Sequence, residues 1–459
     1  MRIWIAACLL LCAMWAARRG VAQTAGTIEG TVLDQSGRHI PGCAVKLTEA
    51  GTNASRAVQT DDRGRFRAAN LPPGLYRVEA TREGFRSAVR EDAALSAGRT
   101  LEIDFRMQLG DLRETLVVTD ESPLLTTSAS DWGGTVGAAQ LGGLPLNGRD
   151  LFDLVAQQPG VVVANHSEGA IFNGLGIQPS ANGARPNQNS FRIDGIYMND
   201  AAASAPASAV GRLLGVEGIQ ELRLITNPFS AEYGRAAGAV FTAVSKSGAN
   251  DWHGSLYHYL RNSALDARNF FDSPSEATPP LRRNQFGAMA SGPIRSDHAF
   301  FMVNYEGIRE ARSRTQRAVT LSAMGREGML PGGPVAVSPL VKPYLALYPL
   351  PNGKDYGDGA GEFVSSAASR NSEHYGVARG DFLVSRRLRT SVRFSGDSGT
   401  GESPDPFLVW AMQSDSRFAF LQSETHFVQS PETLHAFRFG WAHVRNTESA
   451  AAPSLPASL

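Results

Sequence analysis

The feature that most constrains the fold is a series of strand-like segments that begins near residue 251. Polar and apolar side chains alternate in each segment over about ten residues, and wide loops separate the segments. In one of them Val392 and Phe394 fall on one face and Arg393 on the other. The segments are residues 253–262, 286–294, 299–309, 375–384, 389–396, 418–428 and 434–444. This pattern is expected of an outer-membrane β-barrel, although a soluble β-sandwich alternates in a similar way.

The N-terminus predicts an export signal. Residues 1–22 comprise a short positive start, an apolar segment and a small-residue cleavage site at 20–22. Arg18 and Arg19 are unusual before such a site, which leaves a retained N-terminal anchor as an alternative. No later apolar run suits a transmembrane helix, so a position in a membrane would require a β-barrel. Removal of the signal leaves Cys43 alone, which excludes an intramolecular disulfide framework.

The overall charge excludes one class of partner. Lys and Arg together number 44, as do Asp and Glu, so no net field attracts nucleic acid. Charged residues make up 19% of the chain, below the roughly 25% typical of soluble domains. This low charge, together with 47 glycines, favours a mainly β protein with many turns.

Residues 27–110 predict a small β-sandwich. Short alternating strands follow one another closely and are separated by Gly, Pro and Asp turns. The segments G-T-V-L-D-Q-S-G (30–37), T-D-D-R-G-R-F (60–66) and L-P-P-G-L-Y-R-V (71–78) resemble the carboxypeptidase regulatory-like, or transthyretin-like, module. The resemblance implies no catalysis and leaves two roles open, a rigid spacer or a ligand-binding domain.

The middle of the chain, residues 128–247, predicts a small α/β domain. Three strand-like runs (190–193, 219–225 and 240–244) are separated by Gly/Asn turns and a small-residue linker. The motif N-G-A-R-P-N-Q-N-S-F-R-I-D-G-I, starting at Asn182, resembles the plug domain of TonB-dependent outer-membrane receptors of the Oar-like group.

The segments that follow carry the same resemblance. W-H-G-S-L (252–256) and F-F-M-V-N-Y-E-G-I-R (300–309) are similar to the start of Oar-like barrels. The resemblance implies that residues 251–446 form the N-terminal part of an antiparallel outer-membrane barrel around the plug. It also implies a transporter in the outer membrane, with the N-terminal domain in the periplasm and an unknown ligand. The energy would come from the TonB–ExbB–ExbD complex.

A β-prone segment, E-T-L-V-V-T-D (114–120), lies in the linker 111–127. Such a run can pair with any exposed sheet edge. By resemblance it is a TonB box, and the candidate contact residues are Thr115, Leu116, Val117, Val118 and Thr119. The alternatives are the last strand of the sandwich or an inert linker.

Charged residues of the plug are the other candidate site. We hypothesise that Arg185, Asp194, Glu232 and Arg235 form buried charge pairs between the plug and the barrel wall. Residues 182–194 are expected to be structural plug core and not a ligand site.

An enzyme is not expected. G-D-S-G (396–399) mimics a serine-protease nucleophile loop, but no suitable His segment precedes it, and Ser398 is expected in a turn after a strand. The nine histidines form no H-E-x-x-H motif or close i, i+4 pair, so neither a metal site nor a cofactor is predicted.

The number of strands is small for the family. Receptors of this class close about 22 strands around the plug, and an eight-stranded barrel is filled by its own side chains. Only seven or eight candidate strands follow residue 251, and residues 447–459 are expected to form a coil tail. We therefore expect a C-terminally truncated copy of the receptor. The competing class is an exported β-rich binding or adhesion protein that is not embedded in a membrane.

Overall fold

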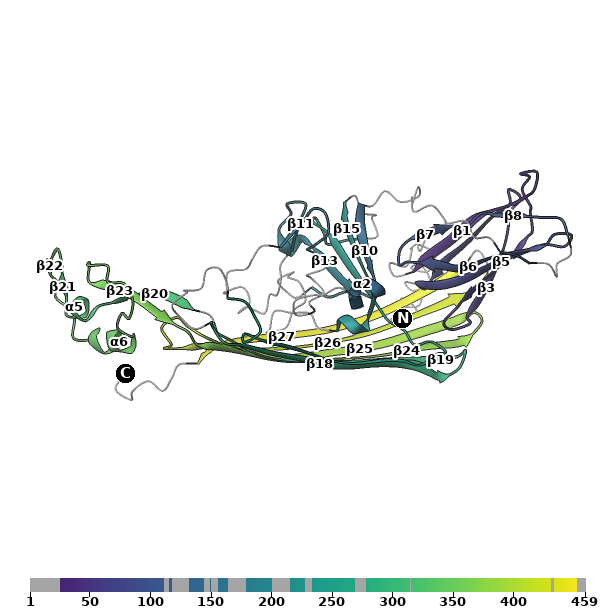
Figure 1. The fold of residues 1–459 in the computed structure, drawn as a ribbon. Coiled ribbons are helices and arrows are strands. Elements are labelled where there is room, and N and C mark those ends of the chain that lie inside the picture. Colours follow the sequence, from purple (N-terminus) through teal and green to yellow (C-terminus); the bar gives the residue numbers. More distant parts are fainter. Residues whose placement is uncertain are drawn as a thin grey trace, which may run out of the picture.

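The protein consists of three β-rich parts arranged along one long sheet. In the computed structural model a sandwich lies at one end of this sheet and a plug domain stands on its concave face (Figure 1). The residues described are 25–110, 115–117, 132–143, 149, 156–163, 179–199, 215–227, 233–268, 278–313, 315–430 and 433–451.

The N-terminal sandwich consists of two packed sheets. One contains β4 (Arg65–Leu71), β1 (Gly26–Asp34) and β7 (Thr100–Glu102), and β8 (Phe105–Met107) also pairs with β1. The other has the order β3 (Ser55–Gln59), β2 (Ala44–Glu49), β5 (Gly74–Thr81), β6 (Ser87–Leu95) and β9 (Thr115–Val117). Alternate residues of each strand point inward, so Ile28 and Phe105 of one sheet share a buried core with Val45 and Val78 of the other. The sandwich predicted from the alternation is confirmed.

The plug is built on a mixed five-stranded sheet. Its order is β10 (Trp132–Gly137), β15 (Ile219–Asn227), β16 (Val240–Ser245), β13 (Ser190–Ile193) and β14 (Ile196–Tyr197). Only β13 and β16 run parallel, and the three strand-like runs of the sequence are confirmed as β13, β15 and β16. The smaller elements are α2 (Ala138–Gly143), β11 (Val161–Val163), β12 (Pro179–Ala181), η1 (Pro186–Gln188) and η2 (Val216–Gly218).

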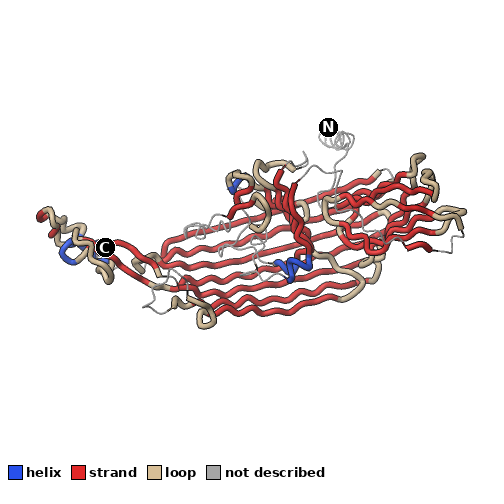
Figure 2. The backbone as a smooth tube through the Cα atoms, turned by 45° about the horizontal axis from the view of Figure 1, so that its top comes forward, coloured by secondary structure: helices blue, strands red, loops and turns tan. Residues whose placement is uncertain are grey.

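A long antiparallel sheet forms the wall under the plug. Each strand pairs with the next in the order β17 (His253–Asn262), β18 (Leu281–Arg295), β19 (Ala299–Ser313), β24 (Ala368–Ser385), β25 (Leu388–Pro404), β26 (Ala411–Val428) and β27 (Leu434–Ala451). All seven expected segments are confirmed as strands. The plug strands cross over this sheet at a steep angle (Figure 2).

The two ends of the wall differ in their connections. Short turns join β18 to β19, β24 to β25, and β26 to β27; we call this the turn end, and the sandwich lies beside it. At the opposite loop end, β19 and β24 are separated by an excursion that projects beyond the sheet (Figure 1). It contains β20 (Gln316–Leu321), α5 (Ala323–Arg326), β21 (Met329–Leu330), β22 (Gly333–Pro334), α6 (Lys342–Leu347) and β23 (Ala360–Ser365). Within the described ranges, no helix is long and apolar enough to cross a membrane.

Two strands extend further than the sequence pattern predicts. The expected coil tail begins at residue 447, but β27 pairs with β26 as far as Ala451. The expected turn at Ser398 is instead the middle of β25, which pairs with β24 on one side and β26 on the other. Hydrogen bonds from both neighbours keep this glycine-rich segment extended.

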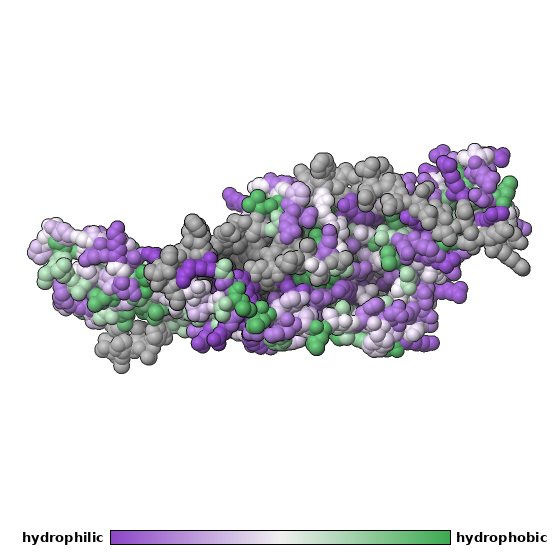
Figure 3. All heavy atoms as spheres, in the orientation of Figure 1, coloured by the Kyte–Doolittle hydropathy of each residue, from purple (hydrophilic) through white to green (hydrophobic). Residues whose placement is uncertain are grey.

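The two faces of the wall have opposite polarity. Side chains toward the plug include many buried polar and charged groups: Arg283, Gln285, Glu306, Glu310, Glu373, Asp381, Arg393, Asp397, Gln422 and Glu424. Those on the opposite face are largely apolar and exposed: Val303, Tyr305, Val392, Phe394, Phe437, Phe439 and Trp441. Hydrophobic patches interrupt the polar surface along the lower margin, over this sheet (Figure 3). A soluble sandwich would reverse this arrangement, so the structure favours the outer-membrane wall.

Candidate functional site

Asp194 occupies the tip of the plug hairpin formed by β13 and β14. Its φ is 47° and that of Gly195 is 80°, the left-handed pair that a tight two-residue hairpin turn requires. The carboxylate accepts hydrogen bonds from the Ser245 amide at 2.9 Å and the Ser245 hydroxyl at 2.7 Å. These bonds from β16 fix the direction in which the negative charge points.

The wall supplies cations to this carboxylate. Arg379 on β24 and Arg393 on β25 place guanidinium nitrogens 3.8 Å and 3.5 Å from its oxygens. Gln422 on β26 donates a hydrogen bond of 2.7 Å to the backbone carbonyl of Asp194. The side chains of Asp194 and Arg393 are 7% and 5% exposed, so little water screens their interaction. The plug is thus attached to three consecutive wall strands.

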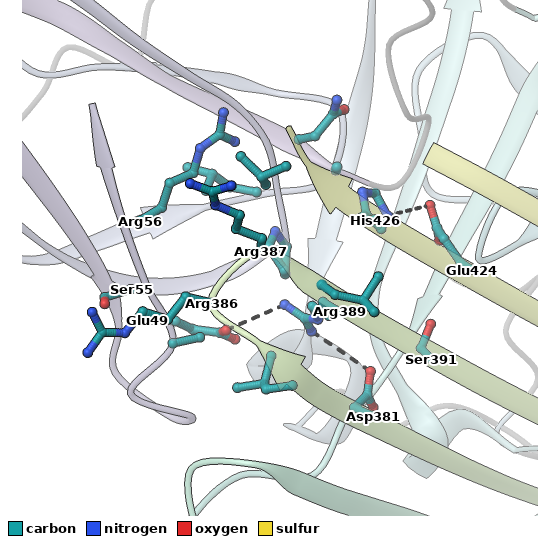
Figure 4. A pocket seen from close by; sticks show the side chains of 18 of the residues that line it. Glu49, Ser55, Arg56, Asp381, Arg386, Arg387, Arg389, Ser391, Glu424 and His426 are labelled. Carbon is teal, nitrogen blue, oxygen red and sulfur yellow. Dashed lines mark hydrogen bonds and ion pairs between the residues drawn. The ribbon is translucent and has the colours of Figure 1, made fainter. Parts of the chain in front are cut away.

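The same charges continue outward to the sandwich. Arg379 donates to both oxygens of Asp381 at 2.8 and 2.9 Å, and Arg389 lies 3.8 Å from Asp381. Arg389 also lies 3.7 Å from Glu49 of the sandwich. Figure 4 shows Arg389 between Glu49 and Asp381. The series Asp194, Arg379, Asp381, Arg389 and Glu49 alternates in sign and connects all three parts; we call it the charge chain.

Further polar contacts hold the sandwich against the plug and the turn end. The Ala97 amide donates to Glu221 Oε1 at 2.5 Å, and the Ala97 carbonyl accepts from Arg223 Nη1 at 3.2 Å. Burial at this contact raises the pKa of the Glu221 carboxyl. On the β18–β19 turn, Asp297 accepts a hydrogen bond of 2.9 Å from Asn53 of the sandwich.

Arg149 forms a second plug–wall contact, which we did not predict from the sequence. Its guanidinium donates to Glu217 Oε1 at 2.5 Å and to the Tyr259 hydroxyl of β17 at 2.8 Å. It also lies over the Tyr259 and Tyr257 rings, 4.7 Å and 5.1 Å from their centroids. The turn-prone N-G-R-D at residues 147–150 was the only signal, and it does not identify the partners.

The three parts enclose a cavity of about 970 Å³ at the turn end. Asp194 of the plug lines it. So do Glu49 and Arg56 of the sandwich and wall residues that include Arg387 and Arg389 (Figure 4). The charge chain forms one side of this cavity. Across the described ranges, no group of three His, Cys, Asp or Glu residues is placed to hold a metal ion.

The N-terminal and C-terminal parts of the chain each match a known domain family. Residues 27–108 match the carboxypeptidase regulatory-like domain, and residues 244–458 match the outer membrane beta barrel domain. The TonB-dependent transporter Oar of Myxococcus xanthus is 28% identical over 314 residues, which are 65% of this chain and 28% of Oar. The chain belongs to the TonB-dependent outer-membrane transporter family. Members of this family are transporters and receptors, not enzymes, and they reside in the outer membrane.

Two other proteins give weaker matches. The probable TonB-dependent siderophore receptor PirA of Acinetobacter baumannii is 24% identical over 191 residues, 39% of this chain and 24% of PirA. The outer membrane transporter YddB from Escherichia coli aligns in structure with a TM-score of 0.45 and 16% identity, covering 68% of this chain and 39% of YddB. The chain spans about a quarter of the length of these curated relatives.

The plug charges named from the sequence lie in different places in this TonB-dependent family member. Asp194 faces the wall cations. Arg185 is exposed, and its backbone amide donates to Gln188 Oε1. Arg235 is also exposed, with its guanidinium 5.4 Å from the centre of the Tyr197 ring. Neither arginine forms an ion pair with the described part of the wall, and Glu232 lies outside the described residues.

The TonB-box-like segment lies at the edge of the sandwich. Residues Thr115–Val117 form β9, which pairs in parallel with β6, Ala88 opposite Leu116. This is the placement expected of a last sandwich strand, one of the alternatives that the sequence left open. Val118 and Thr119 lie outside the described residues.

Proposed function

We propose that this chain belongs to a transporter that moves a ligand across the outer membrane and is energised by TonB. The loop end would face the exterior and the sandwich the periplasm. One observation carries the proposal: a plug is packed and ion-paired on a polar wall whose other face is apolar. A polar interior and an apolar exterior are what a barrel needs to lie in lipid around a hydrophilic passage.

The seven strands would form one arc of a larger barrel. Their sheet has two edges, β17 and β27, and neither pairs further within the described residues. Hydrocarbon does not tolerate unpaired strand edges, and an eight-stranded barrel leaves no room for a plug. A wall that encloses this plug therefore needs more strands than these seven.

TonB would contact residues 115–119 by adding a strand. We propose that β9 leaves β6 for this exchange. The β6–β9 pairing involves only three residues on each strand and is parallel, the slightly less stable pairing per residue. A longer pairing with TonB could therefore replace it. Force transmitted through this segment would then reach the sandwich and the charge chain that connects it to the plug.

A proline substitution tests this contact. Val117→Pro removes a backbone donor that strand addition needs, and Val117→Ile keeps it as the matched control. We expect the purified proline variant to bind the TonB C-terminal domain at least tenfold more weakly in a surface-binding assay, while the isoleucine variant binds normally. Equal binding by both variants would mean that TonB does not bind residues 115–119 by strand addition.

A localisation test is independent of TonB. Fractionation of cells that make the full protein should recover it with outer-membrane porins, and its migration in detergent gels should depend on heating. Recovery in the soluble periplasmic fraction would favour the alternative, an exported binding or adhesion protein not embedded in the membrane.

A further inference from the structure

The cavity at the turn end contains more cations than its acidic residues can neutralise. Seven Lys and Arg residues and five Asp and Glu residues line it. Lys46, Arg56, Arg386 and Arg387 enter no ion pair within the described part of the chain. In Figure 4 the side chains of Arg386 and Arg387 extend from the β24–β25 turn toward the sandwich strand that carries Arg56.

The acidic residues of the cavity already have partners. The charge chain uses Glu49, Asp194 and Asp381. Glu424 lies 2.5 Å from an Arg438 nitrogen and 2.9 Å from His426. Asp297 accepts hydrogen bonds from two amide side chains, one of them Asn53. No acidic group that lines the cavity is therefore left without a donor.

Arg56 carries a guanidinium nitrogen that no acidic side chain of the described structure reaches. It donates a hydrogen bond of 2.5 Å from Nη1 to the Ala69 carbonyl, but its Nε is buried without a hydrogen-bond partner in the described structure. Burial lowers the pKa of this guanidinium. A buried charge without a counter-ion is costly, and the cost falls when an anion binds.

The turn that carries the other two arginines is well defined. The Ser385 hydroxyl accepts hydrogen bonds from the backbone amides of Arg387 at 3.2 Å and Leu388 at 3.1 Å. Both arginines are exposed and line the cavity. Guanidinium groups bind carboxylate and phosphate through paired hydrogen bonds, so their type as well as their charge indicates the ligand.

We propose that this cavity binds a soluble anion that carries two or more phosphate or carboxylate groups, held by Arg56, Arg386 and Arg387. Arg379 and Arg393, two of the wall residues that line it, lie on the polar inner face, away from lipid. A volume of about 970 Å³ accommodates a small organic polyanion together with water. The binding does not depend on TonB or on transport.

Calorimetric titration of the purified full chain tests the site, with pyrophosphate as the probe. We expect saturable binding of one pyrophosphate per chain, weakened about tenfold or more by Arg387→Gln and by Arg386→Gln. Both residues are exposed, so these variants should fold normally. Arg387→Lys keeps the charge without the paired donors and should bind with intermediate affinity. The matched control is Arg295→Gln at the end of β18, which also lies at the turn end but does not line the cavity.

Three results would overturn the proposal. Absence of saturable binding, or equal weakening by Arg295→Gln, would each mean that the arginines are solvated surface charges. The third result concerns the source of the anion. If phosphatidylglycerol nanodiscs abolish pyrophosphate binding and phosphatidylcholine nanodiscs do not, the arginines bind lipid headgroups. Equal affinity in both nanodiscs supports a soluble ligand.

Discussion

Asp194→Asn removes one charge from the plug–wall contact and changes little else. Asparagine also adopts the left-handed backbone that Asp194 has, with φ 47°, and its amide oxygen can still accept from the Ser245 amide. The substitution leaves the charge of Arg393 without its acidic partner. Arg393 is 5% exposed, and among the described residues it keeps a hydrogen bond of 3.3 Å to the Tyr375 hydroxyl. Arg379 keeps both of its hydrogen bonds to Asp381.

The expected cost follows from these contacts. Removing one member of a buried ion pair costs about 3–5 kcal/mol, because the remaining charge stays buried. The separations of 3.5 and 3.8 Å are longer than hydrogen bonds, which favours the lower limit of about 3 kcal/mol. Since 1.4 kcal/mol corresponds to a factor of ten, opening of the plug hairpin should become roughly 100-fold more frequent.

Hydrogen exchange measured by mass spectrometry tests this value. Amides of β13 and β16 should exchange about 100-fold faster in Asp194→Asn, while those of β24 and β25 should not change. Asp251→Asn, at an exposed position beyond the plug, is the control. Adding Arg393→Met to Asp194→Asn removes the buried cation that lacks its partner. The double variant should therefore recover much of the protection of the plug amides against hydrogen exchange. Plug exchange within a factor of about three of the wild type, or no restoration by Arg393→Met, would refute the assigned role of Asp194.

Four further predictions concern other parts of the chain. A disulfide between Ala88→Cys and Leu116→Cys, which are backbone partners in the β6–β9 register, should reduce TonB binding at least tenfold until a reductant is added. Undiminished binding would mean that TonB adds to the open edge of β9. Burial raises the pKa of the Cys43 thiol to about 11, so roughly one molecule in a thousand is thiolate at pH 8, and Ellman's reagent should react only after unfolding. Because the unfolded thiol has a pKa of about 8.5, this group's contribution to stability should decline between pH 8.5 and 11, visible in melting temperatures. In single-tryptophan variants, brominated lipids should quench Trp441 on the apolar face but not Trp410 at the loop end, and the reverse would contradict the membrane orientation.

Much of the fold could be predicted because its signals are local. A period of two determines which side chains share a face, so Val392 and Phe394 could be separated from Arg393 by counting. Strand length was harder, because the glycines and serines of residues 395–401 weaken the alternation. In the structure these residues are extended because the neighbouring strands β24 and β26 hydrogen-bond to both sides of β25.

Less of the site could be predicted because its partners are distant in sequence. The Asp-Gly pair at 194–195 indicates a tight turn, and a charged tip on it is a reasonable candidate contact. Its partners Arg379 and Arg393 depend on where the hairpin meets the wall, which no local pattern encodes. Arg185 lies in an equally polar motif but faces solvent, so composition alone does not distinguish it from Asp194.

The hydrogen bond from Gln422 to the Asp194 carbonyl joins residues that are 228 positions apart, and this separation affects the order of folding. The sandwich closes with contacts among residues 26–117 and can form as soon as they are available. The plug hairpin has no complete binding surface until β26 has been added to the wall. Contacts of such sequence separation form slowly. Asp194 must therefore spend the time between export and wall assembly hydrated, without the cations that later neutralise it.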